Sequence, residues 1–290
     1  MMLGSKFDRR ENSRVKTFRF SKKAEMMVCW FTDTMREPNQ YKMVVFAPHP
    51  DDLSISMGAL AAFLAGQGVQ ITPVLATDGS ESAIPENVLR EHGWAGGEQM
   101  SLRGRIRVQE ASEEARRLGL GKVVLLKHQE WFNRHRTPPA LLRRDCSLNA
   151  VEDFIPGPVT PAALEEIGCL VQGMDVCAVP DPNDRLLMHR IVTQMVCEVR
   201  CEVPVMTYKC LSTVVTSGPQ FLFEFRQELM DVKCHALRAH RSMFERRRQF
   251  GGYSNPGSEG YDILVARADQ EMARVHQSLM PYAESYGWIQ

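Results

Sequence analysis

One histidine and two adjacent aspartates stand close together in FAPHPDD, residues 46–52. This segment ends the apolar run MVVFA, and neighbouring carboxylates repel each other, so Asp51 and Asp52 add nothing to a hydrophobic core. His49 and Asp52 are three residues apart on a predicted strand-to-helix turn, a spacing at which both side chains can reach one ion. Imidazole and carboxylate suit Zn²⁺, and one more protein ligand would complete a catalytic site with a position open for water.

Asp51 has a different predicted role from its neighbour. Pro48 and Pro50 stiffen the turn around His49, because proline fixes the backbone angle φ. Asp51 then falls beside the ion, where it can take a proton from a water whose pKa zinc lowers to about 7. We therefore predict that Asp52 holds the metal and that Asp51 is a catalytic general base. The alternative is an ordinary helix N-cap formed by either aspartate.

Strands and helices alternate along the chain from residue 43 onward. The expected strands cover residues 43–47, 69–77, 122–126, 175–180 and 203–210, and the expected helices cover 54–68, 101–121, 161–173 and 186–199. Such alternation predicts parallel strands joined by right-handed crossovers. We expect an α/β, Rossmann-like fold of three layers, with a mostly parallel sheet of five or more strands in the order 3-2-1-4-5.

This strand order brings the two most polar loop motifs of the chain to one place. Strands 1 and 4 are neighbours, and the chain reverses direction between them. Ligands in such folds bind outside the carboxyl ends of the strands at this switch point. Strand 1 delivers PHPDD there, and strand 4 delivers DPNDRLLMH. We therefore expect the active site at the carboxyl ends of strands 1 and 4.

Longer stretches of the sequence are similar to a known family. APHPDDLSISMGALAAFLAGQGVQITPVLATDGSES resembles the PIG-L/LmbE family of zinc-dependent N-acetylglucosamine-type deacetylases. In that family an HPDD-like motif and a helix precede a strand that ends in a Thr-Asp-Gly turn, which is Thr77, Asp78 and Gly79 here. RVQEASEEARRLGL is similar to the family's next segment, which begins with an Arg-x-x-Glu pair at Arg107 and Glu110.

The resemblance implies a set of metal ligands and one departure. His49 and Asp52 are ligands, and a histidine from the loop after strand 4 is the third. That loop usually reads His-x-Asp-His, and NDRLLMHR places His189 at the final, metal-binding histidine. Leu186 stands where the family's first histidine assists the charged tetrahedral intermediate, and Met188 stands where the family has aspartate. The alternative for His189 is a partly buried histidine on helix 186–199.

Other histidines are candidates to replace the missing helper. His240 lies in KCHALRAHRS, which is similar to a weak C-terminal Lys…His-x-Ser element of the family. We expect it on a C-terminal helix together with His235, and we predict that His240 is catalytic. His128 follows strand 3, where the family often has an Asp-Gly turn. For each of these histidines the alternative is a surface position without a role.

The substrate pocket is expected to include residues that follow strand 2. The pocket would be lined by Thr77 and Asp78, by backbone groups of their turn and by the segment 127–160. Arg107 could bind a substrate hydroxyl, or it could pair with Glu110 or with Glu114 on its own helix.

Composition narrows the class of partner. Lys plus Arg and Asp plus Glu are both 35, so the formal net charge is zero, which argues against nucleic acid and favours a small-molecule substrate. No apolar run approaches the ~20 residues that span a bilayer, and the N-terminus lacks a signal-peptide core. None of the eight cysteines forms a CxxC motif, which indicates buried thiols in a reducing, cytoplasmic compartment. The sequence is compatible with a homo-oligomer.

The sequence divides into an extension and one domain. Residues 1–40 are charged and lack clear periodicity, so we interpret them as a polar N-terminal extension. Residues 41–290 form a single predicted deacetylase-like domain, in which 127–160 is an insertion or a loop at the active-site rim.

The leading functional hypothesis is a zinc hydrolase that removes an N-acyl group, acetyl above all, from an amino sugar or a related small molecule. The first alternative is a metal- or ligand-binding protein of the same fold with weakened catalysis, which Leu186 would explain. The second is an amidase with a non-sugar substrate, which a more apolar rim at residues 186–188 would suit.

Overall fold

The computed structural model describes residues 38–80, 82–97, 99–128, 161–184, 186–199, 202–210, 220–250 and 260–289. A seven-stranded sheet with the order β3-β2-β1-β4-β5-β7-β6 forms its centre. The strands are β1 (Lys42–Ala47), β2 (Gln70–Thr77), β3 (Val124–His128), β4 (Val176–Pro180), β5 (Val205–Tyr208), β6 (Gln220–Phe225) and β7 (Tyr282–Ile289). The predicted order 3-2-1-4-5 of a mostly parallel sheet is therefore confirmed.

The first five strands are parallel, and at least one helix lies between each consecutive pair of them along the chain. β1 pairs with β2 from Lys42 opposite Gln70, and with β4 from Met43 opposite Val176. The strand β7 runs antiparallel to both β5 and β6 and extends the sheet at one edge. The described helices are η2 (Pro38–Gln40), α2 (Asp52–Gly66), α3 (Glu86–Glu91), α4 (Met100–Leu118), α6 (Pro161–Val171), α7 (Leu187–Glu198), α8 (Gln227–Leu237), α9 (Arg241–Phe250) and α10 (Tyr261–Val275).

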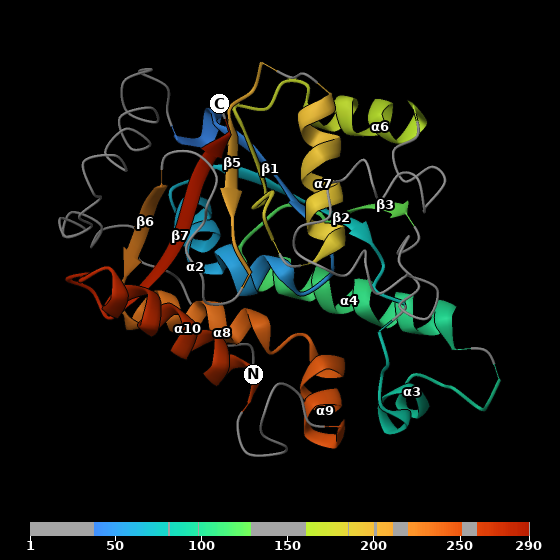
Figure 1. Cartoon of the computed structure of the whole chain (residues 1–290). Helices are drawn as coiled ribbons and strands as arrows, with labels where there is room; N and C mark the ends of the chain where they lie inside the picture. Colours follow the sequence, from blue (N-terminus) through green and yellow to red (C-terminus); the bar gives the residue numbers. More distant parts are fainter. Residues whose placement is uncertain are drawn as a thin grey trace.

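Helices cover both faces of the sheet and give the three layers (Figure 1). Alternate residues of a strand point to opposite faces, so Met43 and Val45 of β1 pack on one side and Val44 and Phe46 on the other. The first pair belongs to the core cluster with α2, α8 and β6. The second pair packs with α6 and α7. Both faces of β1 are thus buried, which accounts for its uninterrupted apolar sequence.

The helix α2 is kinked, and a charged network supports the kink. Met57 has non-helical backbone angles (φ −144°, ψ 22°). The backbone N–H groups of Ala59 and Leu60 each donate a hydrogen bond of 3.0 Å to the carboxylate of Glu284 on β7. Lys233 Nζ of α8 lies 2.7 Å from Glu284 Oε1 and compensates the buried charge of this carboxylate. The C-terminal part of the chain therefore holds the helix that carries the HPDD turn.

The C-terminal third differs most from the expected elements. Residues 203–210 were expected to close the series of strands, whereas β6 and β7 follow and complete the sheet. His240 does not lie on the same helix as His235, because α8 ends at Leu237. The extension 1–40, apart from 38–40, lies outside the described residues, as does the proposed insertion 127–160, apart from 127 and 128.

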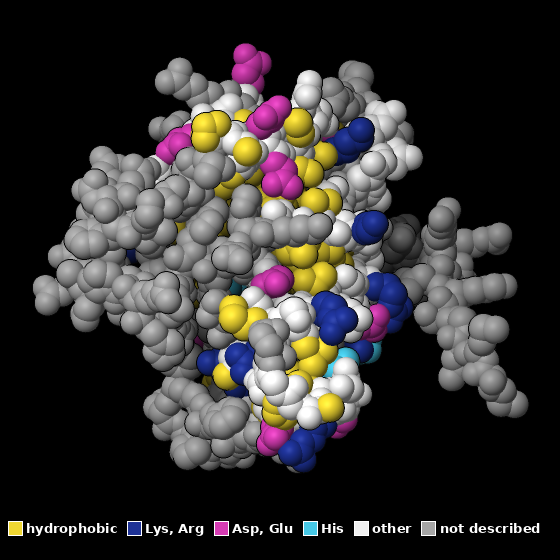
Figure 2. All heavy atoms as spheres, turned by 90° about the vertical axis from the view of Figure 1, so that its right-hand side faces the viewer, with side chains coloured by type: hydrophobic (Ala, Val, Ile, Leu, Met, Phe, Trp, Pro, Cys, Tyr) yellow, Lys and Arg dark blue, Asp and Glu magenta, His cyan; other side chains and the backbone are white. Residues whose placement is uncertain are grey.

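The surface of the described part mixes charges of both signs. On the side where α3 and α6 lie, Lys and Arg side chains are interspersed with Asp and Glu (Figure 2). Among the described residues, no helix combines the length and the apolar character that crossing a bilayer requires.

Candidate active site

The turn after β1 is held by backbone contacts and by the end of β2. The backbone N–H of Asp52 donates to the carbonyl of His49 at 3.2 Å, and the N–H of His49 donates to Asp52 Oδ2 at 2.8 Å. The buried hydroxyl of Thr77 donates to the carbonyl of Pro48 at 2.8 Å. Thr77 therefore fixes the turn. This structural role differs from the predicted role of Thr77 in lining the substrate pocket.

Three residues with metal-binding side chains come together at the switch point between β1 and β4. Donor atoms of His49, Asp52 and His189 all lie within 4.8 Å of one another. Asp52 Oδ2 is 3.1 Å from His49 Nδ1 and 3.2 Å from His189 Nε2. His189 Nε2 is also 3.4 Å from His49 Nδ1. The structure thus brings together the three predicted ligands from two loops 140 residues apart in sequence.

The charges of this cluster stabilise one another. Burial disfavours the charged form of Asp52, but the positive charges of His189 and His49 outweigh burial and hold the pKa of its carboxyl well below the usual range. Burial likewise disfavours the charged form of His189, whereas the carboxylate of Asp52 raises the pKa of its imidazole well above the usual value. A metal cation bound here would take the place of the imidazolium proton, since only neutral imidazole is a ligand.

Asp184 supports His189 from behind. A carboxylate oxygen of Asp184 lies 3.3 Å from Nδ1 of His189, on the opposite side of the ring from Asp52. Both side chains are buried, with exposed fractions of 5% and 0%. Metal-bound histidines commonly direct their second ring nitrogen at a carboxylate, which fixes the orientation of the ring. Asp184 lies in the segment NDRLLMHR, and its role behind His189 was not predicted from the sequence.

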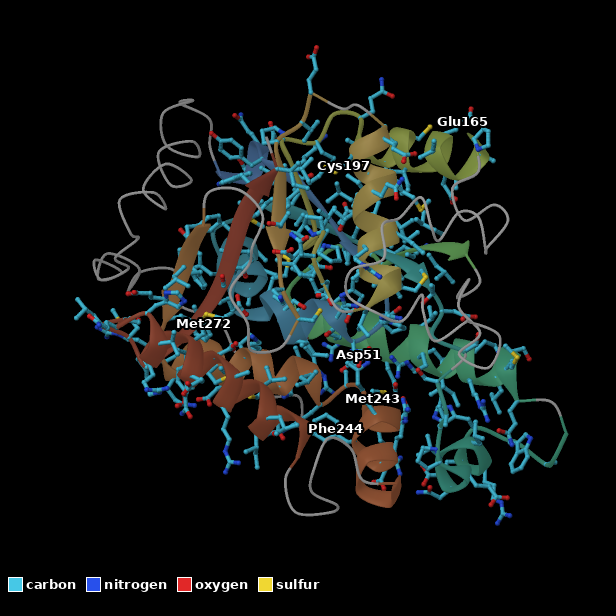
Figure 3. All side chains as sticks on the ribbon, viewed as in Figure 1. Asp51, Glu165, Cys197, Met243, Phe244 and Met272 are labelled. Carbon is cyan, nitrogen blue, oxygen red and sulfur yellow. The ribbon has the colours of Figure 1, made fainter. Side chains whose placement is uncertain are left out.

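Asp51 pairs with a buried arginine. Asp51 occupies the N-cap position of α2 but makes no side-chain capping hydrogen bond. Instead, Arg107 Nη2 of α4 donates to Asp51 Oδ1 at 2.7 Å, and both side chains are buried. In Figure 3, Asp51 lies beside α4. Glu110 and Glu114 bind other groups, so the alternative in which Arg107 pairs with one of them is not the arrangement found. The role of Arg107 in substrate binding stays a prediction.

Two of the three glutamates of α4, Glu110 and Glu114, contact the segment that follows α8. His240 Nε2 is 3.3 Å from Glu114 Oε1, and its Nδ1 is 3.9 Å from Glu110 Oε2. Glu110 also accepts a hydrogen bond of 2.6 Å from the backbone of Ser242. His240 is 0% exposed and is therefore no surface histidine, whereas His235 is exposed.

Asp78 lies against α4 rather than against the three clustered ligands. Its carboxylate accepts a hydrogen bond of 2.9 Å from the backbone of Ser80. A Cβ atom added at Gly104 would lie 2.2 Å from Asp78 Oδ2, so only glycine leaves room for this carboxylate. The role of Asp78 in substrate binding stays a prediction.

The family of the chain follows from a profile match over more than half of its sequence. The family profile of PIG-L, described as GlcNAc-PI de-N-acetylase, matches residues 44–199, which is more than half of the 290 residues. The chain belongs to the PIG-L family. The predicted resemblance is thereby confirmed, and the matched segment contains the HPDD turn and His189.

Solved structures share the fold of this PIG-L protein. N,N'-diacetylchitobiose deacetylase from Pyrococcus horikoshii has a TM-score of 0.57 at 16% identity and covers 94% of both chains. A deacetylase of the teicoplanin biosynthesis pathway has a TM-score of 0.59 at 16% identity, covering 85% of this chain and 96% of its own. The 4-carboxy-2-hydroxymuconate hydratase of Pseudomonas putida has a TM-score of 0.57 at 13% identity, covering 86% and 95%. The comparison with curated proteins gave no match.

The departure from the PIG-L loop pattern lies at the start of α7. Leu186 is the N-cap residue of this helix and is 42% exposed, and its backbone N–H donates to Asp184 Oδ1 at 3.0 Å. Met188 is 3% exposed and packs in the core with α6. The expected apolar rim at residues 186–188 therefore does not include Met188, which weakens the argument for a non-sugar substrate.

We expect His189→Ala to lower the metal content of the purified protein markedly. The substitution removes one of the three clustered donors. Asp184 contacts the far side of the His189 ring, so it does not replace the lost donor. Metal per chain would be measured by mass spectrometry after purification without chelator. His235→Ala is the matched control, because His235 is exposed and does not belong to the donor cluster. Equal metal content in His189→Ala and the parent would show that His189 is no ligand.

We expect Arg107→Met to lower the free energy of unfolding by about 3–5 kcal/mol, because it leaves the buried charge of Asp51 without its partner. Chemical denaturation measures this change. Arg105→Met on the same helix is the control, since Arg105 is exposed and its loss should change stability by about 0.5 kcal/mol or less. Similar stabilities of the two variants would contradict the pairing of Arg107 with Asp51.

Proposed function

We propose that this PIG-L protein is a zinc-dependent hydrolase that removes an N-acyl group, acetyl above all, from an amino sugar or a related small molecule. The observation that carries the proposal is the cluster of His49, Asp52 and His189 with Asp51 directly adjacent in sequence. A binding protein would have no need for a carboxylate base beside a metal site.

The donor set fits zinc. Two imidazoles and one carboxylate are a common ligand set of catalytic zinc sites, which keep a position open for water or substrate. Asp184 behind His189 adds the supporting carboxylate that such sites use. When bound, zinc polarises a carbonyl group and makes water more acidic.

The side chains of the protein supply proton transfer and substrate orientation. Asp51 accepts the proton of the attacking water, and Asp51 or a nearby acid returns a proton to the leaving amine. Since Arg107 holds Oδ1 of Asp51, the other carboxylate oxygen is the one that accepts the proton. Arg107 Nε and Nη1 have no hydrogen-bond partner within the described ranges, so these donors can bind a substrate oxygen.

The substrate class is supported by structural neighbours. One neighbour deacetylates N,N'-diacetylchitobiose, and another is a deacetylase of teicoplanin biosynthesis. We propose an acetylated amino sugar for this chain on that basis. One structural neighbour is a hydratase, so the fold is not restricted to deacetylases.

We also propose that residues 41–290 form one domain, because β1 near its start and β7 near its end belong to the same sheet. A cytoplasmic location is supported by the cysteines. Within the described ranges none of them forms a disulfide; these are Cys169, Cys177, Cys197, Cys210 and Cys234.

We expect Asp51→Asn to retain the metal and to lose turnover by a factor of about 10² to 10⁴, because the amide keeps the shape of the side chain but cannot accept a proton. The assay is release of a primary amine from a panel of N-acetylated sugars by zinc-loaded protein. Metal content and thermal unfolding of the variant check that the site and the fold are intact. Turnover within a few-fold of the parent would remove Asp51 from the mechanism.

We expect Leu186→His to raise kcat by about tenfold or more, because a hydrogen-bond donor to a developing oxyanion contributes about 10² to 10³ in rate. The ring of His240 faces Glu110 and Glu114, so it is not expected to fill this role by direct contact. Leu279→His is the control, since Leu279 is 72% exposed.

If Leu186→His leaves kcat nearly unchanged and His240→Ala lowers kcat at unchanged metal content, the catalytic role predicted for His240 is supported instead. Both variants are measured on the same acetylated sugar.

A further inference from the structure

Glu114 of α4 reaches the first turn of α2 from another helix. Its Oε1 atom accepts a hydrogen bond of 2.9 Å from the backbone N–H of Ser54, and the contact is buried. Ser54 is the third residue of α2, which begins at Asp52 with Asp51 as its N-cap residue. An N-cap aspartate ordinarily accepts a hydrogen bond from the second or third helical residue itself. Glu114 therefore takes the place that the side chain of Asp51 would have in an ordinary helix.

Asp51 is correspondingly released from capping. It makes no side-chain capping hydrogen bond, and its backbone angles (φ −97°, ψ −6°) are helical, whereas an N-cap residue is typically extended. Its carboxylate contacts Arg107 Nη2 at 2.7 Å instead. Arg107 and Glu114 are seven residues apart on α4, about two helical turns, so they lie on the same face. One face of α4 thus binds the carboxylate of Asp51 and also caps the helix that Asp51 precedes.

Glu114 is itself held in place. Its side chain is 1% exposed, and His240 Nε2 lies 3.3 Å from the same Oε1 atom that accepts the Ser54 N–H. A buried carboxylate requires an opposite charge close by. Burial disfavours the charged form of His240, but the Glu114 carboxylate raises the pKa of its ring. Glu110 binds the backbone of Ser242 and so fixes the segment that carries His240.

We propose that Glu114 is a positioning residue for Asp51. It caps α2 through Ser54 in place of Asp51, and it thereby leaves the Asp51 carboxylate free to act as the general base. The inference rests on the role of Asp51 in the proposed function. Glu114 acts on the geometry of Asp51 and exchanges no proton with the substrate.

Two conservative substitutions separate the reach of Glu114 from its charge. Glu114→Asp keeps the charge but shortens the side chain by one methylene group, so the carboxylate no longer reaches Ser54. Glu114→Gln loses the charge but keeps an oxygen at the same distance. With zinc-loaded protein and an N-acetylated sugar, we expect Glu114→Asp to lower kcat by about tenfold or more at similar KM and metal content, because a small displacement of a catalytic group is costly.

Glu114→Gln should stay within a few-fold of the parent kcat. A loss in Glu114→Gln as large as that in Glu114→Asp would show that charge rather than reach matters, and would overturn the proposal. Unchanged kcat in Glu114→Asp would overturn it as well. Glu113→Asp is the matched control with parental kcat, because Glu113 pairs with Arg116 and Arg117 of its own helix.

A double-mutant cycle tests whether Glu114 acts through Asp51. In the Asp51→Asn background the base is already lost, so adding Glu114→Asp should lower kcat by less than about twofold. Losses that multiply would show an independent structural effect and would overturn the proposal.

The crystal structure of Glu114→Asp gives a readout that does not depend on activity. We expect the Asp51 carboxylate to turn toward the N–H of Ser54 and to lose its 2.7 Å contact with Arg107. An Asp51 side chain that stays on Arg107 would overturn the proposal. If Glu114→Asp fails to fold, the crystal structure of the zinc-loaded parent decides, because Asp51 bound to the Ser54 N–H there would contradict capping by Glu114.

The outcomes separate this inference from the proposed function. Full turnover of Asp51→Asn contradicts the base of the proposed function. A loss of turnover in Asp51→Asn without a loss in Glu114→Asp contradicts only the role of Glu114.

Discussion

Two adjacent carboxylates on one buried turn constrain the rest of the structure. Asp51 and Asp52 are each almost fully buried, and a buried charge requires an opposite charge close by. The two partners come from different helices. Arg107 of α4 reaches Asp51 at 2.7 Å, and His189 of α7 reaches Asp52 at 3.2 Å. The sheet order β2-β1-β4 places these helices on opposite faces of β1, so each aspartate meets its own partner.

Stability alone gives little reason to keep such a turn. Replacing a buried ion pair by well-packed apolar side chains is often neutral or stabilising. Here the charges gather at the carboxyl ends of the strands, where ligands bind in α/β sheets. The same burial that makes the charges costly keeps water away and strengthens their electrostatic effect on a substrate. The turn is therefore explained by its chemistry, and the fold holds it in place.

The sequence predicts the parts of this structure whose signals are local. Short apolar runs predicted β1 to β5, and the alternation of strands with helices predicted their order in the sheet. β7 was missed because Glu284 and Ser285 interrupt its apolar pattern, and only the distant Lys233 makes Glu284 tolerable there. The partner of Arg107 was missed for the same reason, since Asp51 is 56 residues away while Glu110 is on the same helix.

We expect one metal ion to bind among His49, Asp52 and His189. Anomalous diffraction at the zinc absorption edge, from crystals of zinc-loaded protein, measures this. We expect a single strong peak, with both imidazoles and the Asp52 carboxylate at about 2.0–2.2 Å. A peak held by other residues, or fully ordered side chains of these three residues with no peak between them, would contradict this expectation.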